Sequence, residues 1–498
     1  MSGYCAVIDI GKTNKKVFVY DRHLQCVHSL QATFEEFEKE GVILEDIDGI
    51  DAWVWNALKE VTARFEIQAV SVTTHGATGV CIDGEGRNVV PLVAYTHEPG
   101  EEFHRAFFDE FGDARTLQQT TCTANFSNLI NLGKGIRFRQ EQFPEAMQQV
   151  KHILNFPQYF GFLLTGIAAA EPTATGCHTY LYDFTTRDWS SVAEKMGIKS
   201  LLPDNMLKPW DILGTVSPTA AARTGLSEEC LVTVGIHDSN SSLLPYLIKG
   251  AKDFVLDSTG TWCVAMRPAK DTAFAAEELG SCVFYNLSAF NQPVKTTIVP
   301  AGMEFEAYTD LFRKIYTNFA VMPFDPGLTQ TVLTQQKLFI APGVLPGMGM
   351  FPQSTMRIIE NGQTLDPARC RAEDLQAGPE ELFAALNLSL AIQTKIGLER
   401  AGARDGTAIY IEGGFRKNDS YARLLGALFP ASDISFTNIE EATSFGAALL
   451  GCAALEGCDP MGLAGAVDIH YEPAAKTALQ DLDEYSAGYL KAVNSGKA

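Results

Sequence analysis

Residues 235–242 have the sequence GIHDSNSS and lie near the middle of the 498-residue chain. An apolar run, Leu231–Val234, precedes this segment, and a helix-like run, Leu243–Ile248, follows it. His237, Asp238 and the hydroxyl groups after them are therefore expected at the carboxyl end of a buried strand, where open α/β sheets bind ligands. An aspartate or serine that merely caps the next helix is the alternative for this segment alone.

Two hairpins of the same design flank this segment. Each consists of an apolar strand, a tip rich in glycine and hydroxyl or lysine side chains, and a returning strand; the tips are Asp9–Lys15 and Ser258–Thr261. Such tips let backbone amides approach an anion, and lysines add charge, so both suit phosphates. Their separation of about 250 residues predicts an internal duplication of two lobes that clamp a nucleotide from both sides. The boundary between the lobes is expected within Leu247–Asp253.

Gly11-Lys12-Thr13 superficially resembles the end of a Walker A loop. That motif needs a glycine five residues earlier, where this chain has Ala6, and it opens a helix rather than a strand. We therefore reject a P-loop here.

Two further loops follow predicted strands. Thr73–Gly79, after the strand 67–72, surrounds His75 with small residues and suits a polyhydroxy ligand; a tight turn around a satisfied histidine is the alternative. Glu412–Asp419, after the strand 408–411, contains Gly413-Gly414, which lets a flat or phosphorylated ligand approach the backbone. A simple helix N-terminus is the alternative there.

The helical patterns are strongest in three segments. Asn155–Gly166 is apolar and ends at glycine, Pro379–Ala401 is long, and Glu440–Leu455 is rich in Ala and Gly, as close helix packing requires. The polar tail beyond Asp468 is expected at the surface.

Composition excludes several classes of function. Hydrophobic residues make up 46% and charged residues 20% of the chain, which is typical of globular proteins, and this length predicts about two to four domains. The net charge of −21 disfavours nucleic-acid binding but allows a small phosphorylated ligand. Eleven cysteines without a Cys-x-x-Cys pair indicate reduced thiols, and the nine histidines lack metal-ligand spacing.

The location expected from the sequence is cytoplasmic. Asp9 interrupts the first apolar run and no cationic start precedes it, so a signal peptide is not expected. No apolar run reaches the roughly 18 residues of a membrane span, so no membrane partner is expected.

Together these segments resemble the FGGY family of carbohydrate kinases over nearly the whole chain, most closely its rhamnulokinase-like branch. The matching pieces are Asp9-Ile10-Gly11 with Lys16, Gly235–Asp238, Ser258–Trp262, Gly413-Gly414 and Glu441–Ala448. The resemblance implies an α/β fold of two actin-like (ribonuclease-H-like) lobes with a central cleft. Residues 1–248 would form the lobe with the sugar pocket and the first phosphate loop. Residues 249–498 would form the lobe with the second phosphate loop and the adenosine site.

The resemblance also implies a kinase that transfers the γ-phosphoryl group of ATP to a ketose or deoxyketose. Asp238 would be the base, and Mg²⁺ would lie near Asp238 and near Asp9, the latter through water. The implied nucleotide contacts are Gly11, Lys12, Thr13, Lys16, Thr259, Gly260, Thr261, Gly413, Gly414 and Asn418. The implied sugar contacts are Thr74, His75, Gly76, Glu98 and His237.

The chain departs from the family pattern at several positions. Lys12 occupies a slot that is usually small or hydroxylic, and contact with a phosphate or exposure to solvent both stay open. Glu412 replaces the first glycine of the usual triple. Thr73–Thr78 lacks both carboxylates of the rhamnulokinase pattern, and Thr96–Glu98 replaces its Arg-Asp-Ser. Because sugar hydroxyls are selected by such buried groups, the sugar stays open.

An actin- or Hsp70-like ATPase is the alternative from another class. The pair His237-Asp238 and the polar loop at Thr74-His75 favour the kinase, because an ATPase of that kind needs no sugar site. The expected partner is a small-molecule sugar, and a homodimer stays an open alternative.

Overall fold

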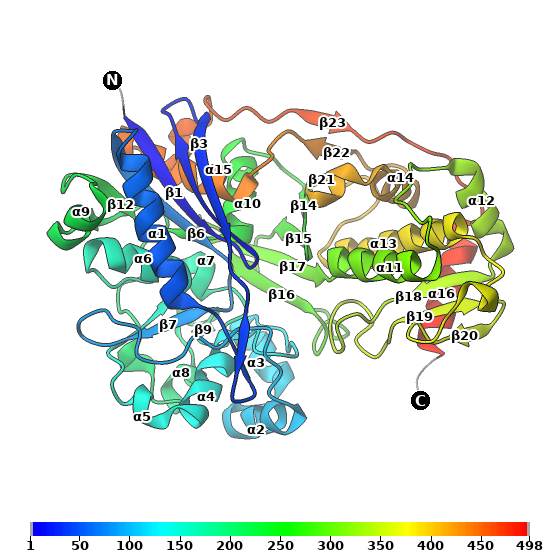
Figure 1. Cartoon of the computed structure of the whole chain (residues 1–498), viewed down its shortest axis with the longest axis horizontal. Helices are drawn as coiled ribbons and strands as arrows, with labels where there is room; N and C mark the ends of the chain where they lie inside the picture. Colours follow the sequence, from blue (N-terminus) through cyan, green and yellow to red (C-terminus); the bar gives the residue numbers. More distant parts are fainter. Residues whose placement is uncertain (1–2, 496–498) are drawn as a thin grey trace. The chain divides into compact units, whose positions relative to one another are not determined.

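The computed structural model describes residues 3–495, which form two compact units (Figure 1). Unit 1 comprises the chain up to Lys252 with 269–294 and 441–468, and unit 2 comprises 253–268, 295–440 and the residues after Asp468. The chain first passes from unit 1 to unit 2 between Lys252 and Asp253, which is inside the range Leu247–Asp253. The chain later returns to unit 1 at 269–294 and at 441–468, which the sequence did not predict. The units are therefore not two contiguous halves divided at residue 248.

The main sheet of unit 1 places its parallel strands at the centre. Its order is β11 (Ile212–Thr215), β12 (Leu231–Thr233), β6 (Ile67–Thr74), β1 (Tyr4–Ile10), β2 (Asn14–Tyr20) and β3 (Cys26–Thr33), with β13 (Ile236–His237) also paired to β6. Strands β1, β12 and β13 run parallel to β6, whereas β2, β3 and β11 are antiparallel to their neighbours. The carboxyl ends of β1, β6 and β13 consequently meet at one edge.

The strands of unit 2 repeat this order. They run β17 (Pro293–Val299), β15 (Cys263–Pro268), β14 (Phe254–Thr259), β21 (Ala408–Gly413), β22 (Ile434–Thr437) and β23 (Tyr471–Pro473). Strands β14, β21 and β22 are parallel, and β15 and β23 are antiparallel to their neighbours, as in unit 1. The predicted hairpins are β1–β2 and β14–β15, and the shared order supports the predicted duplication.

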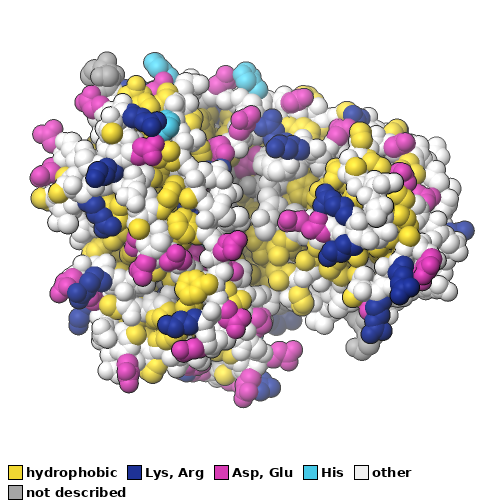
Figure 2. All heavy atoms as spheres, in the orientation of Figure 1, with side chains coloured by type: hydrophobic (Ala, Val, Ile, Leu, Met, Phe, Trp, Pro, Cys, Tyr) yellow, Lys and Arg dark blue, Asp and Glu magenta, His cyan; other side chains and the backbone are white. Residues whose placement is uncertain are grey.

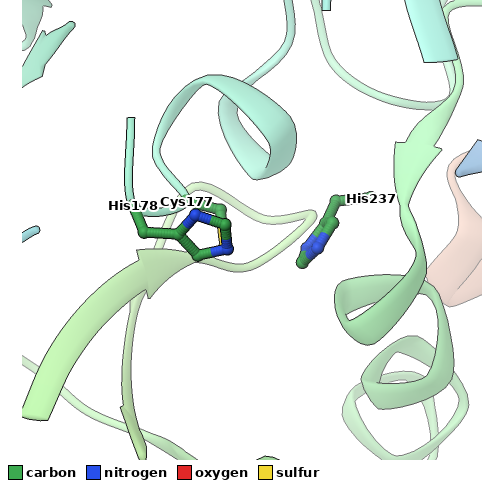
Figure 3. Close-up of side chains that lie close together, drawn as sticks. All are labelled: Cys177, His178 and His237. Atoms are coloured by element: carbon green, nitrogen blue, oxygen red, sulfur yellow. The ribbon is translucent and has the colours of Figure 1, made fainter. Parts of the chain in front are cut away.

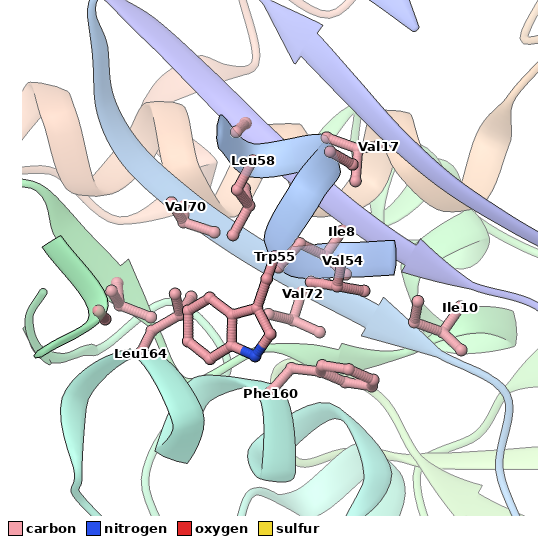
Figure 4. Packing of buried hydrophobic residues seen from close by; sticks show 14 of the residues in the cluster. Ile8, Ile10, Val17, Val54, Trp55, Leu58, Val70, Val72, Phe160 and Leu164 are labelled. Carbon is pink, nitrogen blue, oxygen red and sulfur yellow. The ribbon is translucent and has the colours of Figure 1, made fainter. Parts of the chain in front are cut away.

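Side chains alternate between the two faces of β1, and each face is covered by helices. Ala6, Ile8 and Ile10 belong to a core with α1 (Ile47–Thr62) and α6 (Phe156–Thr165). Figure 4 shows Trp55 and Leu58 of α1 packed over these strands, with Phe160 of α6 beside them. Cys5 and Asp9 point to the other face, onto α15 (Ala442–Glu456). The period of two therefore separates an apolar face from the face that carries Asp9.

The remaining helices and strands lie outside the two strand orders given above. In unit 1 they are α2 (Glu101–Phe111), α3 (Ala114–Thr121), α4 (Leu132–Gln142), α5 (Pro144–Met147), α7 (Pro172–Thr175), α8 (Ser191–Lys195), α9 (Pro218–Thr224), α10 (Asp238–Ile248) and the strands β4 (Phe37–Lys39), β5 (Val42–Leu44), β7 (Gly79–Ile82), β8 (His152–Asn155), β9 (Tyr182–Asp183), β10 (Asp188–Trp189) and β16 (Val283–Leu287). In unit 2 they are α11 (Ala301–Ile315), α12 (Pro326–Gln335), α13 (Pro379–Arg400), α14 (Asp419–Leu428), α16 (Leu482–Asn494) and the strands β18 (Leu338–Ala341), β19 (Arg357–Glu360) and β20 (Gln363–Leu365).

The expectation of a surface tail beyond Asp468 is wrong for its last helix. Helix α16 buries Leu482, Tyr485, Tyr489 and Val493 in unit 2. The Tyr485 hydroxyl donates to the carbonyl of Leu338, 2.7 Å away. The apolar residues recur at helical spacing, and this period places them on one buried face of α16 although polar residues separate them in the sequence.

The surface and the thiols agree with the expectations from composition. On the face in Figure 2, acidic and basic side chains are interspersed over the described residues of each unit. All eleven cysteines are free thiols, and eight of them are buried. No helix in the described part of the chain combines the length and apolar character that crossing a bilayer requires.

Candidate active site

Three segments that are far apart in sequence meet at the carboxyl edge of the sheet in unit 1. In the strand register, Asp9 pairs with Thr73 and Ile10 with Thr74, while Ile236 pairs with Thr73 and His237 with Thr74. The edge therefore carries Asp9, the loop after β6 and the His237-Asp238 pair side by side. The sequence predicted each of these segments at the end of a strand, and the family resemblance implied that they belong to one site.

Asp238 is the first residue of α10, and its side chain is 26% exposed. Its Oδ1 atom accepts hydrogen bonds from the Ser239 amide at 2.5 Å and the Ser239 hydroxyl at 3.1 Å. His237 Nε2 lies 3.1 Å from the same oxygen. No hydrogen bond to the second oxygen, Oδ2, occurs among the described residues, so one carboxylate oxygen is held and the other is available.

Asp9 is a second carboxylate at this edge and is only 7% exposed. Its Oδ2 atom accepts a hydrogen bond of 2.7 Å from the Thr443 hydroxyl of α15. Burial raises the pKa of Asp9 to about 7; the Thr443 hydroxyl opposes this shift, and the negative charge of Asp238 adds to it. Two carboxylates that repel one another in this way form an oxygen-rich site of the kind that a hard divalent cation stabilises.

His237 is fixed on three sides. Its backbone amide donates to the Thr173 hydroxyl at 2.9 Å, and Nδ1 lies 3.2 Å from Asn240 Nδ2. Because an amide nitrogen only donates, Nδ1 accepts and the proton is assigned to Nε2, which donates to Asp238. Burial lowers the pKa of the imidazole, whereas Asp238 raises it.

Glu171 is a functional candidate that the sequence analysis missed. It is fully buried, and its side chain caps α7 by accepting from the amides of Thr173 and Ala174. The Thr173 hydroxyl donates to Glu171 Oε1 at 2.8 Å and accepts from the His237 amide. Burial raises the pKa of Glu171 to about 7, and these amides and the Thr173 hydroxyl oppose the shift. The chain from Glu171 through Thr173 thus positions His237.

The polar groups of the loop after β6 are largely engaged within the loop itself. Thr74 turns its hydroxyl to the carbonyl of His75 at 2.9 Å, so that hydroxyl is already engaged. His75 Nδ1 lies 2.9 Å from the Gly76 carbonyl, and Nε2 makes no hydrogen bond among the described residues. A Cβ atom at Gly76 would lie 2.8 Å from His237 Nε2. Gly76 is therefore required for the position of His237.

The lysines of the first predicted phosphate loop are all engaged. Lys12 Nζ pairs with Glu45 at 2.6 Å, also pairs with Glu36, and lies 4.2 Å from the Tyr95 ring centroid. The structure thus gives Lys12 a third role, beside the two alternatives that the sequence left open. Lys15 Nζ donates to the carbonyls of Gly11 and Lys12, and Lys16 Nζ donates to both carboxylate oxygens of Glu441 at 2.8 Å. Thr13 at the tip is exposed.

Glu45 connects this loop to the loop of His75. It is 6% exposed, and its Oε2 atom lies 3.8 Å from His75 Nε2. Burial raises its pKa, but the nearby His75 imidazole and the Lys12 ammonium outweigh burial and hold the pKa of Glu45 well below its usual range. Glu45 lies outside every motif of the sequence, so only the fold identifies it.

Glu98 binds within its own loop. Its carboxylate accepts from the amides of Gly100 and Asn128 and lies 2.9 Å from His104 Nε2. All of these partners lie within residues 100–128, so the contacts of Glu98 stabilise the local loop structure. Asn286 on β16 was not predicted, and it is 1% exposed with no hydrogen bond to either amide atom among the described residues.

In unit 2 the second predicted phosphate loop lies against the Gly-Gly turn. Thr259 pairs with Gly413 across β14 and β21, and the Thr259 hydroxyl donates to the Glu412 carbonyl at 2.5 Å. Gly413 has φ +83°, and a Cβ atom there would lie 1.9 Å from the Thr259 carbonyl oxygen. Only glycine fits this turn. The Gly260-Thr261 backbone packs equally closely on Gly302 at the start of α11.

Asn418 caps α14 and extends this region toward a cavity. Its amide nitrogen donates to Asn387 Oδ1 at 2.8 Å. Asn387 lines a cavity of about 460 Å³ within unit 2. The other lining residues are mostly apolar or aromatic: Met322, Pro323, Phe324, Asp325, Pro326, Leu328, Thr329, Glu380, Phe383, Ala384, Ser420 and Leu424. A flat ring with a polar edge suits such a cavity.

Comparison with known proteins gives the family. Residues 4–245 match the N-terminal domain of the FGGY family of carbohydrate kinases, and residues 251–459 match the C-terminal domain of carbohydrate kinase FGGY. A rhamnulokinase of Halalkalibacterium halodurans is 24% identical over 267 residues, which cover 52% of this chain and 55% of that protein. The match thus spans little more than half the length of this curated relative.

Solved structures share the fold over the whole chain. A carbohydrate kinase from Novosphingobium aromaticivorans has 24% identity and a TM-score of 0.77, with 100% of both chains covered. The glycerol kinase of Plasmodium falciparum, solved with ADP, has 17% identity and a TM-score of 0.78, covering 100% of this chain and 99% of that one. These likenesses confirm the expected α/β fold with actin-like, ribonuclease-H-like units. With both of its domains matched, the chain belongs to the FGGY family of carbohydrate kinases.

Proposed function

We propose that the protein transfers the γ-phosphoryl group of ATP to a hydroxyl group of a ketose or deoxyketose, of the rhamnulose or fuculose kind or another ketose. The observation that carries this proposal is the position of Asp238 at the strand edge. Its Oδ1 atom is hydrogen-bonded to His237, its Oδ2 atom is available, and Asp9 lies next to it. Phosphoryl transfer needs one carboxylate to orient the attacking hydroxyl and further groups to hold charge.

In the proposed reaction the Oδ2 atom of Asp238 takes the proton of the sugar hydroxyl. At the same time the oxygen of that sugar hydroxyl bonds to the γ-phosphorus of ATP. The bond between that phosphorus and the β–γ bridging oxygen breaks, which gives a sugar phosphate and ADP. The hydrogen bonds at Oδ1 keep the carboxylate oriented during this step. The neighbouring His237 supplies an N–H donor at the same place.

The donor set at this edge fits Mg²⁺. Asp9 and Asp238 offer carboxylate oxygens, and a cation beside Asp9 would favour the charged form that burial disfavours. The cation would supply charge neutralisation for the phosphates. Gly11, Thr13 and Lys16 remain proposed phosphate neighbours; Lys16 would first have to release Glu441. Lys12 is better explained as the partner of Glu45.

For the sugar, we propose the surroundings of His75, Gly76 and His237, joined by Glu45 and Asn286. These groups offer unpartnered polar atoms at His75 Nε2 and on the Asn286 amide, and Glu45 Oε2 lies near the former. Buried polar atoms without partners carry a cost that sugar hydroxyls would relieve. The contacts of Thr74 and Glu98 are already used, so they are the weaker candidates.

For the nucleotide, we propose that Thr259, Gly260 and Thr261 contact the phosphates. Gly413, Gly414 and Asn418 would contact the adenosine, with the base in the cavity beside Asn387. The close backbone approach at Gly413 and the aromatic lining of that cavity support this assignment. An actin- or Hsp70-like ATPase would use the same groups without a sugar.

A panel of ketoses and deoxyketoses tests the proposal. Each sugar is incubated with ATP and Mg²⁺, and the products are identified by ³¹P NMR as sugar phosphate or inorganic phosphate. We expect at least one sugar to be phosphorylated at a rate far above the hydrolysis of ATP alone. If no sugar accepts phosphate while ATP is hydrolysed to inorganic phosphate, the ATPase alternative replaces the proposal.

A further inference from the structure

One cluster in unit 1 has the donor set of a soft metal site. The ligand atoms of Cys177, His178 and His237 all lie within 4.8 Å of one another (Figure 3). Cys177 is 2% and His237 4% exposed. Figure 3 shows the two imidazoles facing the same space from different segments, one after α7 and the other at the end of β13.

His178 is already arranged as a ligand. Its Nδ1 lies 2.9 Å from the Ile130 carbonyl oxygen, which only accepts, so Nδ1 carries the proton and Nε2 is free. Metal-binding histidines characteristically donate their other N–H to a carbonyl or carboxylate in this way. The backbone of His178 has φ +43°, in the left-handed region that non-glycine residues seldom adopt. Local strain of this kind is typical of functional sites.

His237 can present its Nε2 atom to the same space. Asn240 Nδ2 faces His237 Nδ1, while Asn240 Oδ1 has no hydrogen bond among the described residues. A half-turn of this amide would place Oδ1 against Nδ1, move the imidazole proton there and free Nε2 for a cation. The unpartnered oxygen is thus explained if the amide serves two states of His237.

We propose that Cys177, His178 and His237 bind Zn²⁺, or a cation of the same preference, with Asp238 as a further oxygen ligand. Asp238 Oδ1 lies 3.1 Å from His237 Nε2, so it is within reach of the same ion. Ligand atoms on one zinc ion lie roughly 3.5 Å apart, so the side chains must draw together by about 1 Å. The thiol of Cys177 loses its proton to solvent as the sulfur–metal bond forms.

Binding of this ion would inhibit the kinase. It would occupy both His237 and Asp238, which the proposed reaction needs, and this consequence rests on the proposed function. Sulfur and imidazole ligands select zinc-type ions, whereas Mg²⁺ prefers oxygen. An excess of Mg²⁺ therefore would not displace the zinc.

Cobalt spectroscopy tests the site without reference to activity. Metal-free, full-length protein is titrated with Co²⁺, and we expect one equivalent to give a thiolate-to-cobalt charge-transfer band that one equivalent of Zn²⁺ removes. Cys177→Ser should lose that band, and His178→Gln should weaken zinc binding at least tenfold. Cys81→Ser, which removes another buried thiol of unit 1, is the matched control and should keep the band.

Circular dichroism verifies that each variant is folded, and His178→Gln stands in if Cys177→Ser does not fold. Absence of the band in the folded wild-type protein, or its persistence in Cys177→Ser, would overturn the site. Inhibition is then measured with zinc at excess Mg²⁺, relative to the zinc-free activity of each variant; we expect Cys177→Ser to raise the inhibitory concentration at least tenfold. Equal sensitivity would overturn the inhibitory role, whereas a band in a protein that phosphorylates no sugar would count against the proposed function alone.

Discussion

The position of the His237 imidazole requires that residue 76 has no side chain. A Cβ atom there would come within 2.8 Å of His237 Nε2, closer than such contacts occur. We expect Gly76→Ala to displace the imidazole from Asp238 and to lower kcat/KM for the sugar by about tenfold or more, equivalent to about 1.4 kcal/mol. Steady-state kinetics with the accepted sugar measures this.

The matched control is Gly84→Ala, where a Cβ atom would come no closer than 3.8 Å to Lys151. It should leave kcat/KM unchanged. If the two variants behave alike, the contact between Gly76 and His237 does not matter for turnover.

Glu171 makes stability depend on pH in a defined direction. Burial raises its pKa from 4.5 to about 7, so between these values the folded chain keeps a proton that the unfolded chain has lost. The free energy of unfolding therefore falls as the pH rises through this range, by at most about 3 kcal/mol from this group. Glu171→Gln does not titrate, so the stability advantage of the wild type over this variant should be larger at pH 5 than at pH 8.

Urea unfolding of both proteins at the two pH values measures the difference. The exposed Glu228→Gln provides the control and should track the wild type at both pH values. An advantage of the wild type that is constant or grows with pH would show that Glu171 is charged in the folded chain.

Individual side-chain roles were predictable only where neighbours in sequence decide them. Asp238 follows a strand and opens a helix, which located it at a strand end, but a helix cap fits the same pattern and only the family resemblance implied its role as the base. Lys12 and Lys16 looked like phosphate ligands, yet they pair with Glu45 and Glu441, which are 33 and 425 residues away. Glu171 and Asn286 carry no motif at all, because their importance arises from burial, which the sequence does not state.

At the level of elements, the approach of α15 to α10 is limited by one residue. A Cβ atom at Gly446 would lie 1.9 Å from the Ser241 carbonyl oxygen, and the Ser241 hydroxyl donates to the Thr443 carbonyl. Since Thr443 also binds Asp9, this helix pair supports the carboxylate at the strand edge. The Ala- and Gly-rich composition of the segment predicted close packing, and the structure identifies Gly446 as the point of contact.

We expect Gly446→Ala to lower the free energy of unfolding by about 1–3 kcal/mol, because overpacking forces the two helices apart. Gly426→Ala on α14 is the control: nothing lies within 4 Å of its Cβ position, so it should stabilise by about 0.5–1 kcal/mol through helix propensity. Denaturant unfolding compares the two. Equal effects would mean that α15 and α10 adjust without cost.

For the whole molecule, the sequence predicted the repeat better than the path of the chain. Hairpins β1–β2 and β14–β15 carry local signals, because apolar strands alternate with small polar tips, and they imply the shared strand order. The return of α15 to unit 1 has no local signal, since an Ala-rich helix packs equally well on any flat apolar surface. Topology of this kind is decided by contacts between distant segments.

The proposed phosphoryl transfer requires Asp238 as the base, and Asp238→Asn is the variant that tests this role most directly. With the exposed Asp204→Asn as control, the turnover of the accepted sugar and the Kd of Mg²⁺-ADP are measured on the same preparations. Loss of a general base lowers kcat by about 10²–10⁴, and Asn keeps the size of the side chain, so we expect that loss with nucleotide binding nearly unchanged. A kcat within about twofold of the wild type would contradict the proposed role of Asp238 in phosphoryl transfer.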